Sequence, residues 1–140
     1  MSFFRNKMVG ELLGSDRTIK EKAMHKANIL AIHCIDLRFQ EMIERDLQQR
    51  AGYGKFDRIS WPGASIDLDV VTKAALISLK LHNPDEVLIY EHEECGAYGD
   101  DNSKDTHKTN AQRLAEALMQ EKPSLQVQTL IATFNGIKRL

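Results

Sequence analysis

Residues 28–34 read N-I-L-A-I-H-C, and this stretch decides how the rest of the sequence is interpreted. Ile29 to Ile32 are apolar without interruption. A strand with one face in water alternates apolar and polar residues, whereas a strand covered on both faces is continuously apolar. The stretch therefore predicts a buried strand in the interior of a parallel sheet.

Three further stretches have the composition of strands. They are KFDRISW at 55–61, EVLIYEH at 86–92 and LQVQTLIATF at 125–134. Stretches with helical periodicity lie between them, and strands that alternate with helices form parallel sheets covered on both faces. The sequence therefore predicts an α/β fold: a three-layer sandwich whose mostly parallel central sheet of about four strands is flanked by helices.

The helices are predicted from apolar residues spaced three and four apart. One helix is predicted at 39–50, a second follows a cap at Ser65, and a third is at 110–121. A short helix is also predicted at 15–27. The apolar face of the second helix is predicted to be Ile66, Val70, Ala74, Ile77 and Leu81. The polar stretch 99–110 is predicted to be a loop. The whole chain, 1–140, is expected to be a single domain with an N-terminal helical arm at 1–27.

Composition excludes several classes of partner. The 140 residues include 19 Lys and Arg against 20 Asp and Glu, for a formal net charge of −1, which gives no electrostatic basis for binding nucleic acid or an acidic membrane. No apolar run approaches the ~20 residues that span a bilayer. The first residues lack the pattern of a signal peptide, so the expected location is the cytoplasm. There, two cysteines are expected to be thiols or metal ligands rather than a disulfide.

Both cysteines lie where a parallel α/β sheet binds ligands. Cys34 ends the first predicted strand, His92 ends the third, and Cys95 follows one turn later. Side chains beyond the carboxyl ends of neighbouring parallel strands converge at one edge of the sheet. Two thiolates and one imidazole suit zinc, and three protein ligands leave a fourth position open, as in catalytic sites. The alternative is that Cys34 is a small core residue and Cys95 a loop thiol.

Asp36 and Arg38, in the stretch C-I-D-L-R, are the candidate catalytic pair. An arginine keeps a neighbouring carboxylate ionised, and such a carboxylate can accept a hydrogen bond from a water on the metal. The alternative interpretation of this pair is an ordinary surface salt bridge.

Three further residues are candidates for the substrate pocket. Gly96 is expected to relieve crowding beside Cys95, whose thiolate the start of a helix would favour. Trp61 and Tyr98 flank the predicted site and offer a dry aromatic lining, although Trp61 can equally be a core residue.

At these residues the chain resembles the β-class carbonic anhydrases, whose signature is C-x-D-x-R followed by H-x-x-C. Here these motifs are Cys34 to Arg38 and His92 to Cys95, followed by Gly96. The resemblance implies Zn²⁺ as cofactor with Cys34, His92 and Cys95 as ligands, and the Asp36–Arg38 pair as the dyad. It also implies reversible hydration of carbon dioxide to bicarbonate by a zinc-bound hydroxide, in a homodimer or higher homo-oligomer with the active site near a subunit interface.

The chain also departs from that family. Where members usually carry Arg-Asn-Ala-Gly, residues 60–65 read S-W-P-G-A-S, and the chain is shorter than most members. Two alternatives therefore stay open. One is hydrolysis of a related linear molecule, carbonyl sulfide or carbon disulfide. The other is a zinc-binding protein of the same fold that has lost catalysis.

Overall fold

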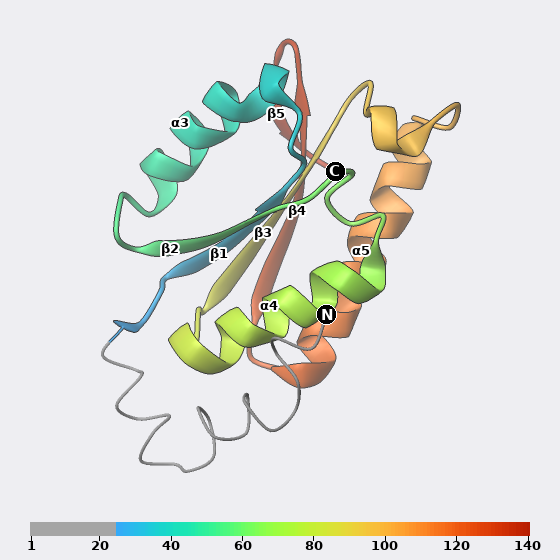
Figure 1. Cartoon of the computed structure of the whole chain (residues 1–140). Coiled ribbons are helices and arrows are strands. Elements are labelled where there is room, and N and C mark those ends of the chain that lie inside the picture. Colours follow the sequence, from blue (N-terminus) through green and yellow to red (C-terminus); the bar gives the residue numbers. More distant parts are fainter. Residues whose placement is uncertain (1–24) are drawn as a thin grey trace.

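The computed structural model describes residues 25–140, which form three layers (Figure 1). A sheet lies in the middle, with helix α3 on one face and helices α4 and α5 on the other. The predicted three-layer α/β architecture is confirmed. Most of the predicted N-terminal arm, residues 1–24 including nearly all of the helix expected at 15–27, lies outside the described residues.

The sheet has five strands in the order β2-β1-β3-β4-β5. They are β1 (Ile29–His33), β2 (Phe56–Ser60), β3 (Glu86–His92), β4 (Gln126–Thr133) and β5 (Gly136–Arg139). The first four are parallel, and β5 pairs antiparallel with β4. The sequence prediction of about four strands missed β5, because this edge strand is short and only partly buried.

Strand β1 is buried at every residue, as its apolar sequence predicts. It lies between β2 and β3, with Ile29 opposite Phe56 on one side and Glu86 on the other. Because β1 and β3 are hydrogen-bonded neighbours, the residues that follow them emerge at the same edge of the sheet. This pairing is what brings Cys34 and His92 together.

Helix α3 (Gln40–Arg50) covers one face of the sheet and follows a short 3₁₀ helix, η2 (Leu37–Phe39). Its buried residues Ile43 and Leu47 pack with Phe39 against side chains of β1 and β3. The helix predicted at 39–50 is therefore confirmed to within one residue.

Helix α4 (Leu68–His82) covers the other face, but with a different side than predicted. The residues it buries are Val71, Ala75, Ser78 and Leu79. Two members of the predicted stripe, Ile66 and Val70, are 40% and 39% exposed. The stretch contains adjacent apolar residues, so more than one face fits helical spacing. The predicted cap was also wrong, since Asp67 is the N-cap residue and the Ser65 side chain bonds elsewhere.

Helix α5 (Lys104–Glu121) begins inside the stretch predicted to be a loop. Its N-cap is Ser103, whose side chain accepts a hydrogen bond from the Thr106 backbone N–H at 3.2 Å. The first turns of this helix are polar, so they lack the apolar periodicity that predicts a helix. One consequence is that His107, expected in a loop, is fully buried in this helix.

Candidate metal centre

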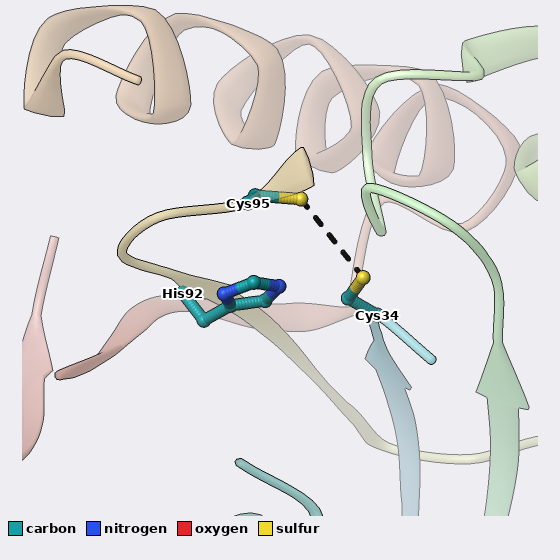
Figure 2. A group of neighbouring side chains, drawn as sticks. All are labelled: Cys34, His92 and Cys95. Carbon is teal, nitrogen blue, oxygen red and sulfur yellow. Dashed lines mark hydrogen bonds between the residues drawn. The ribbon is translucent and has the colours of Figure 1, made fainter. Parts of the chain in front are cut away.

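Cys34, His92 and Cys95 lie together at the carboxyl end of β1 and β3, and their side chains point toward one another (Figure 2). The three potential ligand atoms all lie within 4.8 Å of one another, and all three residues are buried. The convergence predicted from strand ends is therefore present, and this cluster could hold a metal ion.

The spacing of the two sulfur atoms fits a tetrahedrally coordinated zinc ion. Two thiolates on one zinc at about 2.3 Å each would lie about 3.8 Å apart. Here the Cys34 and Cys95 Sγ atoms are 3.9 Å apart. The Nδ1 of His92 lies 2.7 Å from the Glu93 carbonyl oxygen, which places the ring proton on Nδ1. His92 Nε2 is buried without a hydrogen-bond partner among residues 25–140, as expected of a nitrogen kept for a metal.

The turn between His92 and Cys95 is short and tightly shaped. Glu94 has a φ of +53°, a left-handed conformation that a residue with a side chain adopts at some cost. Cys95 precedes a 3₁₀ helix of three residues, η3 (Gly96–Tyr98). Gly96 was predicted to relieve crowding beside Cys95. This was wrong, because a Cβ added at Gly96 would meet nothing within 4 Å.

The two thiols differ in acidity. The hydrogen bond shared with the Cys95 thiol, together with His92 and the backbone N–H of Gly63, lowers the pKa of Cys34 although burial opposes this. The hydrogen bond to Cys34 and burial raise the pKa of Cys95. The backbone N–H groups of Ala97 and Tyr98, at the start of η3, lower the pKa of Cys95 as the sequence analysis expected, but the two other effects outweigh them.

Gly63 is a functional residue that the sequence analysis passed over as part of a turn. Its N–H donates to Cys34 Sγ at 3.2 Å. Its φ is +77°, and a Cβ added there would lie 2.3 Å from the Ile66 Cγ2 and 3.0 Å from the Ala97 Cβ. Glycine is therefore required here both by conformation and by space.

Asp36 and Arg38 lie beside the cluster and form an ion pair with two side-chain hydrogen bonds. Arg38 Nη2 donates to Asp36 Oδ2 at 2.7 Å, and its Nε to Oδ1 at 3.1 Å. The backbone N–H of Arg38 also donates to Oδ1, at 2.9 Å. These hydrogen bonds from Arg38 lower the pKa of Asp36 to about 2. Asp36 Oδ2 lies 3.8 Å from His92 Nε2. The carboxylate therefore faces the nitrogen atom that would bind a metal.

Arg38 is itself held from three directions. Its Nη2 donates to the Glu94 carbonyl oxygen at 2.9 Å, which ties it to the turn between the two ligands. Its guanidinium lies over the rings of Phe39 and Phe134, at 5.6 and 5.5 Å from the centroids. Phe134, which belongs to the turn between β4 and β5, was not singled out from the sequence.

The two aromatic candidates for the pocket differ in burial. Tyr98 packs against both cysteines and is buried. Burial and the Glu91 carboxylate raise the pKa of Tyr98, so its hydroxyl stays protonated and donates to Glu91 at 2.6 Å. Trp61 is 38% exposed and its Nε1 donates to Asp67 at 3.2 Å, so it is not a core residue.

A pocket of about 450 Å³ lies away from the cluster, since none of the three potential ligands lines it. It is lined by His33, Gln40, Glu41, Glu44, Arg58 and Ser60. His33 immediately precedes Cys34, and successive residues of a strand point to opposite faces of the sheet. His33 is accordingly absent from the group of ligand atoms that converge on Cys34.

Solved structures with this fold include β-carbonic anhydrases. The β-carbonic anhydrase CafA of Aspergillus fumigatus has a TM-score of 0.58 and 18% identity, covering 98% of this chain and 87% of its own. A tetrameric β-carbonic anhydrase from Sordaria macrospora has a TM-score of 0.51 at 18% identity, covering 98% of this chain and 93% of its own. The apo form of a carbon disulfide hydrolase has a TM-score of 0.62 at 11% identity, covering 99% and 91%. The fold is thus that of the β-carbonic anhydrases, and the Cys34, His92 and Cys95 cluster resembles their zinc site.

The sequence comparison leads to the family. The family model described as "Putative carbonic anhydrase" matches residues 24–136, and the chain belongs to this family as a short, divergent member. An uncharacterized protein of Rickettsia conorii is 26% identical over 135 residues, 83% of this chain and 73% of that protein. An uncharacterized protein of Rickettsia bellii is 27% identical over 135 residues, 83% and 82% of the two chains. None of the helices in the described part of the chain is long and apolar enough to cross a membrane.

Proposed function

We propose that this chain is a zinc enzyme that reversibly hydrates carbon dioxide to bicarbonate. The observation that carries the proposal is the Asp36–Arg38 pair, whose carboxylate oxygen lies 3.8 Å from the free Nε2 of His92. A metal with a purely structural role needs no oriented acceptor at its open position. The match to the carbonic anhydrase family agrees with this assignment.

Cys34, His92 and Cys95 would hold the ion. A bound zinc lowers the pKa of its water to about 7, which supplies a nucleophile at neutral pH. Arg38 keeps Asp36 ionised, so Asp36 can accept a proton in a hydrogen bond but cannot donate one. The pair thereby orients the nucleophile, and the buried ring of Tyr98 beside both cysteines offers an apolar wall that suits an uncharged substrate.

A homo-oligomer is part of the proposal. Side chains around the Asp36–Arg38 pair are apolar and exposed, notably Leu37 at 81% and Ile35 at 53%. The structural neighbour from Sordaria macrospora is described as tetrameric. A second copy of the chain covering this apolar rim would narrow access to the site. The cytoplasmic location expected from the sequence stays a prediction.

Stopped-flow carbon dioxide hydration by the zinc-loaded chain tests the function, with Asp36→Asn as the comparison. We expect activity in the wild-type chain and a loss of about 100-fold in the variant, with zinc retained. Equal turnover by the two proteins would remove Asp36 from the mechanism.

A second candidate substrate, carbon disulfide or carbonyl sulfide, is favoured by the structural likeness to a carbon disulfide hydrolase. Zinc-loaded chain that is inactive on carbon dioxide but releases sulfide from either compound would establish this alternative. Inactivity on all three would leave a zinc-binding protein without catalysis.

A further inference from the structure

A buried carboxylate lies directly behind the metal cluster and has no part in the proposed chemistry. Glu91 is only 1% exposed, although it immediately precedes His92 in strand β3. Its side chain points to the opposite face of the sheet from His92, toward α4 and α5, because successive residues of a strand face opposite sides. An ionisable group in the core is costly unless hydrogen bonds compensate it.

Three side chains provide that compensation. The Ser65 hydroxyl donates to Glu91 Oε2 at 2.6 Å, and the Tyr98 hydroxyl donates to Oε1 at 2.6 Å. His107 Nδ1 lies 2.7 Å from the same Oε1, and this imidazole is fully buried. Both carboxylate oxygens are therefore occupied, by residues from three separate segments.

Two of these segments adjoin the metal cluster, as does Glu91 itself. Ser65 lies two residues after Gly63, whose N–H donates to the Cys34 sulfur. Tyr98 lies three residues after Cys95, and Glu91 itself is bonded covalently to His92. A single carboxylate thus ties together the segments that position all three potential ligands.

The histidine extends the network to the backbone of a ligand. The other ring nitrogen of His107, Nε2, lies 3.4 Å from Asn102 Oδ1. The same Asn102 oxygen accepts a hydrogen bond from the Cys95 N–H at 2.7 Å. The Asn102 side chain is fixed from its other end, since Nδ2 donates to the Gly99 carbonyl at 3.0 Å. The Tyr98 and His107 rings stack with centroids 3.9 Å apart, which leaves the network little freedom.

We propose that Glu91, together with Ser65, Tyr98 and His107, forms a positioning network that holds the Cys34, His92 and Cys95 side chains in the geometry for binding a metal. The inference rests on the proposed metal site and deepens it, since it assigns a role to buried polar groups that are not themselves metal ligands. Partners of this kind behind metal ligands typically change affinity by about 10- to 100-fold when altered.

The chain provides matched controls for this network. Tyr90 also donates a 2.6 Å hydrogen bond to a carboxylate, that of Asp46, and Ser78 donates one of 2.6 Å to Asp57. Neither of these bonds reaches the metal cluster. Tyr98→Phe can therefore be compared with Tyr90→Phe, and Ser65→Ala with Ser78→Ala, because each pair loses the same chemical group.

The experiment measures zinc affinity by competition with a chromophoric chelator, and the unfolding of the metal-free proteins by denaturant. We expect Tyr98→Phe, Ser65→Ala and the isosteric Glu91→Gln each to weaken zinc binding about 10-fold or more, with an altered absorption spectrum of the Co²⁺-loaded protein. The control variants are expected to lose stability without losing affinity or changing the spectrum.

Two results would overturn the positioning role: wild-type affinity in the three network variants, or an equal loss in the two controls. Failure of the wild-type chain to bind zinc would overturn it as well. If the wild-type chain binds zinc, the network variants weaken binding, and carbon dioxide is not hydrated, the proposed activity fails while the positioning network stands.

Discussion

The two sides of the candidate metal centre are built in opposite ways. On the front side, Asp36 and Arg38 are two residues apart and hydrogen-bonded to each other, and the Arg38 side chain is 40% exposed. On the back side, Glu91 is buried and bonds to residues 7, 16 and 26 positions away. The front offers groups that could act on a substrate, whereas the back offers only support.

Residues on the front side are therefore expected to serve the reaction, and residues on the back side to serve folding and metal binding. A change on the front side is expected to lower turnover while leaving the metal in place. A change on the back side, or in the ligands, is expected to lower metal affinity or stability first. The two kinds of measurement therefore distinguish which side a residue serves.

The largest effect is expected where the two sides meet, at the ligands. Cys34→Ser or Cys95→Ser removes one of the three converging ligands, so stoichiometric zinc should be lost and the fold destabilised. Zinc at 1,000 times its dissociation constant should stabilise the wild-type chain by about 4 kcal/mol, and should stabilise neither variant. Thermal unfolding with and without zinc, paired with metal analysis, checks this. Zinc retained at one ion per chain by either variant would contradict the ligand assignment.

An intermediate effect is expected at Gly63, which supports Cys34 from the back. Gly63→Ala forces an alanine to a φ of +77° and places its Cβ 2.3 Å from Ile66 Cγ2. We expect the free energy of unfolding to fall by about 2–4 kcal/mol and zinc affinity to fall with it. Denaturant titration and chelator competition measure the two effects.

Gly52→Ala is the matched control for Gly63→Ala. Gly52 has the same φ of +77°, but a Cβ there would meet nothing within 4 Å. This variant should lose about 1 kcal/mol of stability and no zinc affinity. The two variants could instead lose the same free energy of unfolding and both keep wild-type zinc affinity. The hydrogen bond from Gly63 to Cys34 would then have no role in holding the metal.

The front of the site could be predicted from sequence because its geometry is local. Parallel strands end at a common edge, so Cys34 after β1 and His92 at the end of β3 had to approach each other once these strands were neighbours. The Asp36–Arg38 pair needs only a short turn to form. Two short motifs and one buried strand were therefore enough to place five residues.

The back of the site could not be predicted in this way. Ser65 looked like a helix cap because Ser is a common cap residue, but its hydroxyl is used by Glu91. His107 lies in a polar stretch that gave no helical signal, although it is buried in α5. Long-range hydrogen bonds between polar residues leave no periodicity in a sequence. A glutamate directly before a candidate ligand was the one visible hint, because β3 was predicted to be buried.

The same limit explains the error on α4. Val70 and Val71 are adjacent, and so are Ala74 and Ala75, so helical spacing fits either of two faces. The structure buries the second member of each pair, together with Ser78. The Ser78 hydroxyl on this face is satisfied by a hydrogen bond to Asp57. The face that is buried packs against side chains of β1, β3 and α5, so contacts between distant parts of the chain decide between the two faces.

The smallest effect is expected at Phe134, whose ring lies against Arg38 and Phe39. Its ring lies 5.5 Å from the Arg38 guanidinium and 4.9 Å from the Phe39 ring, and about half of its surface is exposed. Phe134→Ala should loosen Arg38 and lower kcat/KM about threefold without changing zinc affinity. Phe134→Leu keeps an apolar side chain but removes the aromatic face, so activity restored by leucine would show that packing alone orients Arg38. A fall in zinc affinity as large as that expected for Tyr98→Phe would instead mean that the turn between β4 and β5 supports the ligands, and the division between front and back would fail at this residue.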